Sequence, residues 1–377
     1  MIDYETLRIV WWLLLGVLLI GFAVMDGFDL GAAILMPWLG KTDLERRVCI
    51  NCIGPTWEGN QVWFILGGGA IFAAWPMLYA VSFSGFYLAM LWVLLALILR
   101  PVGFKYRSKL SNITWRLYWD RALFVGGFVP SLIFGVAIGN VLQGVPFHFD
   151  ESLRPFYTGT FLELLNPFAL LSGLLSVAML SMHGAFFIHI KTQEQIQARA
   201  KTAGKFFALL TSLLFISGGL WLYLSGYGYK LNSIVMHAGP SNPLYKSVVY
   251  QTDAWFHNYQ SMHVALLAPA LGILLPLFAC GLARFPKIAF LCSAGSIASI
   301  IATVGISMFP FMLPSSTHPN HSLLVWDSSS SQLTLSIMLI GTAIFLPIVL
   351  AYTTWVYRVL RGKVSEQNII DNIDTAY

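Results

Sequence analysis

Three carboxyl groups stand inside apolar stretches of this sequence, where acids are costly. Asp26 and Asp29 lie near the end of an apolar run that begins at Trp11, and Glu58 lies in the next long stretch, CINCIGPTWEGNQVWFILGGGAIFAAW. An ionised Asp at the centre of a membrane span costs about 2.5–3.5 kcal/mol on insertion scales. Because intramembrane acids commonly mark routes for protons or ions, these three carboxyls are the first candidates for chemistry.

The spacing of the three acids indicates a shared polar layer. Asp26 and Asp29 are three residues apart, which puts them one helical turn from each other on neighbouring faces. Glu58 lies at a similar depth in the following helix, and the short connection between the two helices favours antiparallel packing. We therefore expect the three carboxyls to face one seam near the cytoplasmic side and to relay protons from the cytoplasm.

Buried acids can also be purely structural, and the sequence keeps that alternative open. Asn60 and Gln61 can donate hydrogen bonds to a carboxyl, and Arg100 can pair with one of the acids. Gly27 and Gly31 would let another helix approach closely. Three acids in one layer favour the functional interpretation over the structural one.

Histidine and cysteine give weaker signals for metal chemistry. An axial haem ligand must lie well inside a helix bundle, and only His183 lies deep enough in a predicted span. A lone histidine is more often a satisfied core residue. Cys49 and Cys52 form an isolated C-x-x-C without a second pair, so we interpret them as small apolar residues one turn apart. No metal site is therefore predicted.

The composition is that of an integral membrane protein. The chain has 377 residues, of which 57% are hydrophobic and 10% charged, and its mean hydropathy is +0.71. Soluble domains carry about 25% charged residues. The net charge of +5 does not indicate a nucleic-acid partner, because the basic residues alternate with apolar segments. The opening MIDYETLR is partly acidic and no cleavage site follows, so the first run is predicted to span rather than to be a signal peptide.

An all-α polytopic membrane protein with about nine transmembrane helices is predicted, forming a single domain over residues 1–377. Eight runs are plainly apolar, and the ninth, 49–74, is interrupted by proline and polar residues. The positive-inside rule favours including it, because all but four of the 22 Lys and Arg then lie on one side of the membrane. That side is the cytoplasm, which places the N-terminus in the periplasm and the C-terminus in the cytoplasm. The predicted spans are 9–37, 49–74, 78–99, 122–142, 164–190, 206–225, 262–283, 288–310 and 333–357.

Aromatic residues near the ends of these spans are interpreted as interfacial anchors. Trp355 and Tyr357 are two of them. The segment 191–205 is interpreted as a short polar connector between two spans.

Multi-residue motifs occur in order along the whole chain. They are GFDLG (27–31), PTWEGNQVW (55–63), IFAAWP (71–76), FSGFYLAM (83–90), RPVGFKYRSK (100–109), GNVLQGVPF (139–147), LLNPFALLSG (164–173) and FPFMLPSS…LLVWDSSSSQLTLSIM (309–338). Together they resemble subunit II of the cytochrome bd-type quinol oxidases, with no large insertion needed.

The resemblance implies a respiratory function in a bacterial inner membrane. Members of this family pair with a homologous subunit I and with one or more small single-span subunits. The complex oxidises quinol near the outer face, reduces O₂ to water and takes the protons from the cytoplasm, so turnover builds a proton-motive force. The cofactors are two haems b and one haem d, held mainly by subunit I, together with the quinone. The resemblance implies membrane lipid and no nucleic acid as further partners.

The resemblance also assigns roles to residues of this chain. Glu58 matches an acid of a proton route, where Asp is the more familiar residue. Lys109 and Tyr377 match polar positions near the cytoplasmic mouth of that route. With Asp26 and Asp29 they make up the predicted proton pathway.

Two further residues match an access route for oxygen or quinone in relatives, and one departs from the family pattern. Trp63 and Arg100 are the matching pair. Lys105 stands where an acid is common, so we leave it out of the predicted site.

Two alternatives to this function remain. A secondary transporter could use the carboxyls as coupling sites, but such proteins often show related halves and broken helices. The sequence shows no internal repeat, and its one strongly broken span is 49–74. A purely architectural chain that scaffolds its partner is the second alternative.

Overall fold

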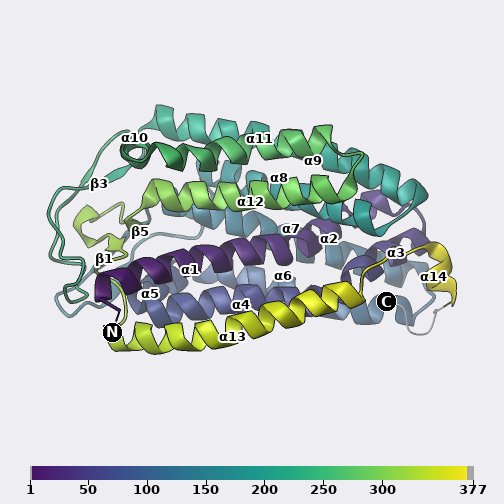
Figure 1. Ribbon diagram of the computed structural model, residues 1–377, viewed down its shortest axis with the longest axis horizontal. Helices are drawn as coiled ribbons and strands as arrows, with labels where there is room; N and C mark the ends of the chain where they lie inside the picture. The colour runs from purple at the N-terminus through teal and green to yellow at the C-terminus, as the bar shows by residue number, and fades with distance from the viewer. Residues whose placement is uncertain (1, 372–377) are drawn as a thin grey trace.

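The computed structural model describes residues 2–371 of the chain as an elongated bundle of helices (Figure 1). Tyr377, one of the predicted proton-pathway residues, lies outside the described residues. Helix α1 begins at one end of the bundle, together with the short strands, and we call this the cap end. Helices α3 and α14 lie at the opposite end, which we call the α3 end (Figure 1).

Within the described residues, ten helices build the body of the bundle. They are α1 (Tyr4–Met25), α2 (Gly27–Leu39), α4 (Trp57–Ala74), α6 (Tyr87–Tyr106), α7 (Ile113–Gln143), α8 (Pro167–Lys191), α9 (Glu194–Ser225), α11 (Leu267–Gly281), α12 (Pro286–Met308) and α13 (Gln332–Val359). Four short helices lie at its ends: α3 (Asp43–Ile53), α5 (Pro76–Gly85), α10 (His257–Ser261) and α14 (Glu366–Asp371). The 3₁₀ turns are η1 (Arg107–Lys109), η2 (Leu162–Leu165), η3 (Ala254–Phe256), η4 (His263–Leu266) and η5 (Pro319–His321).

The strands of residues 2–371 lie at the cap end. They form three antiparallel pairs: β1 (Phe147–Phe149) with β2 (Pro155–Tyr157), β3 (Tyr229–Leu231) with β4 (Val248–Tyr250), and β5 (Phe311–Leu313) with β6 (Leu323–Leu324). The expected all-α polytopic fold is therefore confirmed, with small hairpins covering one end.

Eight segments of the described chain are long and apolar enough to cross a membrane, and one of them runs through α1 and α2 as a single 36-residue unit. Helix α4, which the sequence predicts as the ninth span, is not among these eight, because the polar residues of its first turn lower its mean hydropathy. Its 18 residues span about 27 Å, close to the thickness of the hydrocarbon core. It lies beside α1 and α13 within the bundle (Figure 1).

Two predicted span boundaries are wrong. The segment 49–74 contains the end of α3 and all of α4, separated at residues 54–56. Pro55 explains this break, because proline lacks an N–H and disfavours helix in the residue before it. The predicted span 78–99 is divided into α5 and α6, and the crossing helix runs on to Tyr106. Apolar residues continue through the junction of α5 and α6, so hydropathy could not reveal that the helix is divided there.

Two other predicted spans are shorter than the helices that contain them. Helix α7 starts at Ile113 and helix α9 at Glu194, so much of the predicted connections 100–121 and 191–205 is helical. Good helix formers such as Glu, Gln, Ala and Lys continue a helix beyond the apolar segment, whereas hydropathy marks only the part that lipid requires.

Helix α2 lies at the centre of the bundle and packs on α7 and α8. Nearly all of its residues are buried. Glycine makes the close approach possible: a Cβ on Gly31 would lie 1.9 Å from the carbonyl oxygen of Leu180, and a Cβ on Gly184 would lie 2.4 Å from the amide nitrogen of Ala32. The expectation that Gly31 admits a neighbouring helix is confirmed.

Charged residues fix the α3 end. The buried guanidinium of Arg107 donates to Asp120 at 2.5 Å and to Asp43 at 2.9 Å. Arg46 also pairs with Asp120, and Arg116 with Asp43. This network joins α3 to η1 and α7.

At the cap end, one arginine fastens the long segment after α9 to the first helix. Arg8 is fully buried and donates to the carbonyl oxygens of His237 and Gly239 and to the hydroxyls of Ser241 and Ser329. Four acceptors satisfy most of the donors of one guanidinium.

Replacing Gly31 by Ala is expected to destabilise the protein by about 1–3 kcal/mol, because the added methyl group meets backbone that cannot turn aside. Thermal unfolding of the purified protein measures the change. Gly218→Ala is the matched control, since no atom lies within 4 Å of the added Cβ and Ala is the better helix former. Equal stability of the Gly31→Ala variant and the native protein would contradict the close approach of α2 and α8.

Candidate functional site

A buried ion pair lies where α1 meets α2. Asp26 occupies the single residue between the two helices, and its carboxylate accepts two hydrogen bonds from Arg100 of α6, at 2.7 and 3.0 Å. Neither side chain is exposed. The guanidinium also lies over the ring of Trp57, 5.7 Å from its centre. This bidentate geometry is the strong form of an arginine–carboxylate pair, and it confirms the expectation that Arg100 pairs with one of the acids.

Asp29 lies one turn further on and is held quite differently. One carboxylate oxygen accepts a hydrogen bond from the side-chain amide of Asn60 at 2.7 Å. The other oxygen is buried and has no partner within the described chain. The carbonyl oxygen of Asn60 accepts a hydrogen bond from the hydroxyl of Tyr357 at 2.8 Å. A chain of three side chains therefore joins α2, α4 and α13.

This chain of side chains ends at a cleft of about 420 Å³ between α1, α4 and α13. Met25 and Trp63 form one wall, and Tyr357 with its neighbours on α13 forms the other. Gly21 lets the ring of Trp63 lie against α1, since a Cβ there would be 2.4 Å from the ring. The buried acid Asp29 is thus two side chains away from an open cleft.

Glu58 does not face the two aspartates, so the expectation that three carboxyls face one seam is wrong. Its side chain is 68% exposed, and its nearest cation is Lys105, at 3.9 Å. The reason is helical geometry: Glu58 and Asn60 are two residues apart, which is about 200° around α4. Because Asn60 faces Asp29, Glu58 faces the outside of the bundle.

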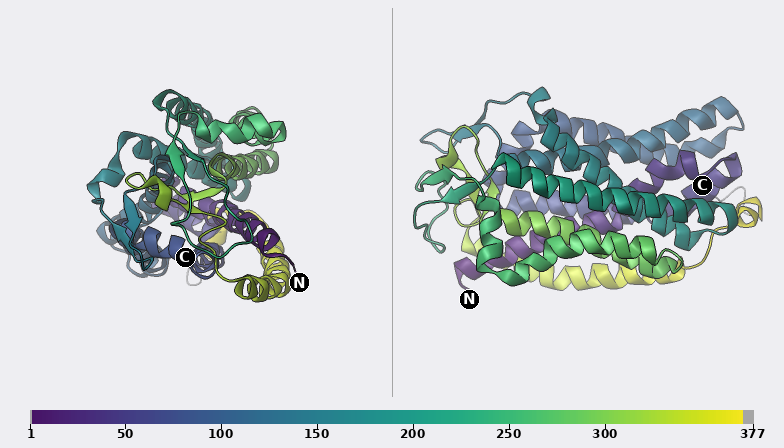
Figure 2. Two further views of the ribbon diagram at one scale, coloured as in Figure 1. Left: turned by 90° about the vertical axis from the view of Figure 1, so that its left-hand side faces the viewer. Right: turned by 90° about the horizontal axis from the view of Figure 1, so that it is seen from above.

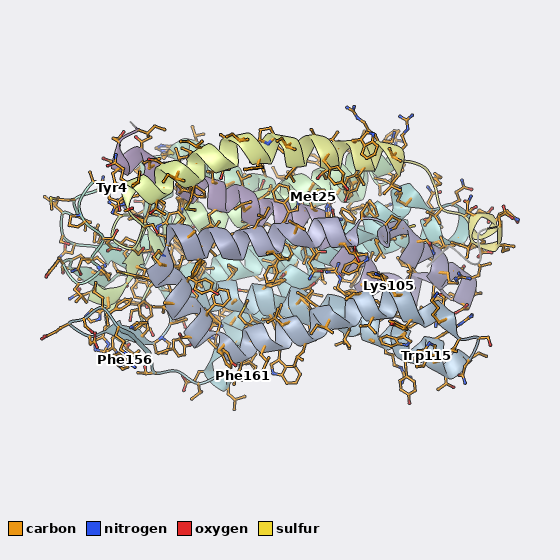
Figure 3. The ribbon with its side chains drawn as sticks, turned by 90° about the horizontal axis from the view of Figure 1, so that it is seen from below. Tyr4, Met25, Lys105, Trp115, Phe156 and Phe161 are labelled. Carbon is orange, nitrogen blue, oxygen red and sulfur yellow. The ribbon has the colours of Figure 1, made fainter. Side chains whose placement is uncertain are left out.

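The remaining predicted residues fall in different places. Trp63 lines the cleft, whereas Arg100 is sealed against Asp26. Lys109 is exposed at the end of η1, one turn beyond Lys105. Figure 3 shows Lys105 toward the α3 end and Met25 nearer the middle of the bundle.

The sequence analysis did not predict the contacts of two residues near these acids, Tyr357 and Lys105. Tyr357 was interpreted as an interfacial anchor, yet its hydroxyl bonds Asn60 across 297 positions of the chain. Lys105 was left out, yet it is the nearest cation to Glu58. No local pattern marks either residue, because each role depends on which helices become neighbours.

The deep histidine is a satisfied core residue, as expected. The ring nitrogens of His183 lie 2.7 Å from the hydroxyl of Ser293 and 3.0 Å from the carbonyl oxygen of Val24. Both are engaged, so His183 offers no free nitrogen to a haem iron. Within residues 2–371, no group of three or more His, Cys, Asp or Glu side chains is placed to hold a metal ion. Cys49 and Cys52 are buried thiols of the apolar core, in agreement with their interpretation as small apolar residues.

Comparisons with known proteins give one consistent answer. Residues 7–360 match the family model described as cytochrome bd terminal oxidase subunit II. The chain is 52% identical to a probable cytochrome oxidase subunit 2 of Haemophilus influenzae, over 98% of both chains. It is 49% identical to the cytochrome bd-I ubiquinol oxidase subunit 2 of Escherichia coli K12 over 100% of both chains, and 30% identical to the Bacillus subtilis cytochrome bd ubiquinol oxidase subunit 2 over 96% of this chain and 98% of the relative.

The fold is also found in a solved structure. A chain of the bd oxidase from Geobacillus thermodenitrificans superimposes with a TM-score of 0.70, at 16% identity, over 94% of this chain and 99% of that one. At this low identity the match concerns the fold alone. The family match favours the oxidase over the transporter alternative.

Arg100→Gln is expected to lower the stability of the protein by about 3–5 kcal/mol, because it leaves the buried Asp26 carboxylate without a counter-charge. Adding Asp26→Asn to the same variant removes that charge and should recover part of the loss. Thermal unfolding measures both variants. Lys105→Gln is the comparison, since an exposed pair contributes about 0–1 kcal/mol. A loss for Arg100→Gln no larger than for Lys105→Gln would show that the buried pair does not support the fold.

Proposed function

Because this chain belongs to the cytochrome bd terminal oxidase subunit II family, we propose that it works beside subunit I in a complex that oxidises quinol and reduces O₂ to water. It is a multi-pass protein of a bacterial inner membrane. Within that complex we assign this chain two tasks: to support the haem-bearing partner and to deliver protons from the cytoplasm.

The surface formed by α4 and α6 supports a contact with subunit I. Glu58 and Lys105 are exposed there on helices that cross the membrane. Charged groups in a membrane normally face a protein neighbour or water, because lipid cannot solvate them. Gly69 of α4 lies about 20° around the helix from Glu58, is exposed, and has open space where a Cβ would be. Small residues let a second helix approach closely, so this surface suits a protein partner.

The distribution of charge supports the orientation of the chain in the membrane. Helix α1 begins at the cap end, and α13 ends toward the α3 end (Figure 1). The cap end holds few cations, whereas the α3 end holds Arg46, Arg107 and Arg116. By the positive-inside rule the α3 end faces the cytoplasm and the cap end faces the periplasm.

Proton delivery in this proposal starts at the α3 end. Lys109 and Lys105 lie near the cytoplasmic mouth, and Glu58 takes up the proton at the contact surface with subunit I. Asp29 provides a second protonatable group, because one of its oxygens is free of hydrogen bonds. Asn60 orients that carboxylate and carries no proton itself. Tyr377 stays a predicted member of this route.

The haems b and d supply the redox chemistry of the complex. His183, the one histidine deep in a predicted span, does not offer a free ring nitrogen as an axial ligand. We therefore propose that subunit I holds the haem irons, and that Trp63 and the cleft beside it give oxygen or quinone access to the complex. The small single-span subunits stay a prediction from the family resemblance.

Glu58→Gln is expected to slow quinol-driven oxygen uptake by roughly 100-fold, because the amide cannot accept the proton that a positioned carboxylate accepts. The complex is co-purified with its partner, its haem content is read from the optical spectrum and its oxygen uptake is then measured. Haem content should stay normal. Glu151→Gln, at an exposed acid of the cap end, is the control. Full activity of the Glu58→Gln complex would remove Glu58 from the proton route.

Asp29→Asn tests the second acid in the same assay. The amide keeps the hydrogen bond with Asn60 but cannot exchange a proton, so oxygen uptake should fall while thermal stability is unchanged. Tyr357→Phe should lower uptake less, because it only frees Asn60 to turn. Asp253→Asn and Tyr352→Phe are the matched controls. A loss of stability without a loss of turnover would mark Asp29 as structural.

A further inference from the structure

Three histidines lie together at the cap end, on two segments that are far apart in the sequence. His148 belongs to β1, whereas His318 and His321 flank the short η5 turn. The ring centres of His148 and His318 are 4.9 Å apart, and those of His318 and His321 are 5.3 Å apart. The left view of Figure 2 looks onto this end of the molecule, where hairpins and loops cover the ends of the helices.

His321 is bonded to β1 through the backbone. The N–H of Phe149 donates a hydrogen bond to Nδ1 of His321 at 3.0 Å. Because a backbone amide can only donate, Nδ1 must carry no proton, so this bond exists only while Nδ1 is unprotonated. Phe149 is 4% exposed, so protonation of Nδ1 would leave a buried donor without its acceptor.

The bond to His321 is the last of a row of contacts along β1. The N–H of Val145 donates to the carbonyl oxygen of Pro314 at 3.0 Å. The carbonyl oxygen of Phe147 accepts a hydrogen bond from the hydroxyl of Ser315 at 2.5 Å. Amide and hydroxyl groups do not titrate near neutral pH, whereas an imidazole does. The His321 contact is therefore the pH-sensitive member of this row.

The groups around His321 oppose a positive charge on its ring. His148 and His318 carry a positive charge when they are protonated, and Lys246 adds another from the segment before β4. Burial lowers the pKa of the His321 imidazole from its ordinary value of 6.5, and the charges of His318, Lys246 and His148 lower this pKa further. The closed arrangement therefore favours the neutral ring.

The acids near this cluster are engaged by other groups. Asp327 pairs with Lys246 at 2.6 Å. Asp150, which follows β1, accepts a hydrogen bond from the N–H of Arg154 at 2.9 Å. The guanidinium of Arg154 lies over the aromatic ring that stacks on His148, so it brings a further cation to the cluster.

We propose that the contact between His321 and β1 is a pH-sensitive switch, which opens the cap end of this chain when the periplasm becomes acidic. While the ring is neutral, it holds β1 against the η5 turn. When the ring is protonated, Phe149 loses its acceptor and the neighbouring imidazoles repel the new charge. The proposal goes beyond the oxidase function and needs no turnover, whereas the identity of the acidified compartment rests on the proposed orientation.

The sign of the pH dependence follows from the lowered pKa. Once the cap opens, His321 returns toward its ordinary pKa of 6.5, so the open form binds the proton more readily than the closed form. The contact stabilises the closed form fully above that pH and loses its effect as the pH falls below it. At about pH 5.5 the ratio of open to closed cap should have risen about tenfold.

A second group could make the cap sensitive to acid without His321. Burial raises the pKa of Asp327, and protonation of its carboxylate would weaken the pair with Lys246. Substitution of His321 separates the two explanations, because it leaves that pair in place.

Hydrogen–deuterium exchange of the complete purified complex, at about pH 7.5 and about pH 5.5, tests the switch. After correction for the intrinsic pH effect on exchange, protection of the Phe149 amide in the native complex should fall about tenfold at the lower pH. His321→Asn should stay protected at both, because its amide oxygen accepts the same bond and does not titrate. His257→Asn, at an exposed histidine of α10, is the matched control and should behave like the native complex.

Two further variants separate the bond from the surrounding charge. His321→Ala removes the acceptor, so protection should be low at both pH values while the haem spectrum stays normal. His318→Gln keeps the bond and removes one neighbouring cation, so the fall in protection on acidification should be smaller.

Three results would overturn the proposal. The first is a native complex whose Phe149 amide stays protected at the lower pH. The second is a His321→Asn complex that loses protection on acidification as the native complex does, which would assign the response to Asp327. If His321→Asn is unprotected at both pH values, His318→Gln decides, and an unchanged fall in that variant is the third.

Discussion

The ion pair between Asp26 and Arg100 is the interaction on which the arrangement of the membrane helices depends. Taking two charges out of water costs several kcal/mol for each, and only a well-placed partner offsets that cost. Asp26 stands where α1 passes into α2, and Arg100 stands on α6. Once both charges are buried they must meet, so the pair fixes α6 against the junction of the first two helices.

The same layer holds a second acid that the pair does not satisfy. Asp26 accepts two charge-assisted hydrogen bonds, whereas Asp29 accepts one from a neutral amide and keeps one oxygen free. The two aspartates are one turn apart, yet they are chemically unequal. The two acids can therefore have different roles. Asp26, paired with Arg100, can give structural support. Asp29, linked through Asn60 to Tyr357, can exchange protons as proposed.

The third acid, Glu58, lies on an exposed face of the bundle. Glu58 and Lys105 face outward on spanning helices, and their separation of 3.9 Å gives each only weak support from the other. Gly69 is exposed on the same face of α4 as Glu58. These features suit contact with another protein better than contact with lipid.

The sequence by itself determined the class of the protein and the positions of its most apolar helices. Low charge, long apolar runs and the placement of Lys and Arg act locally or along the chain, so they could be read without coordinates. The sequence could not show that Glu58 faces away from Asp29, or that α5 and α6 are separate helices. It also could not show that the hydroxyl of Tyr357 bonds Asn60. Those facts depend on which faces of distant helices meet, and packing of the whole bundle decides that.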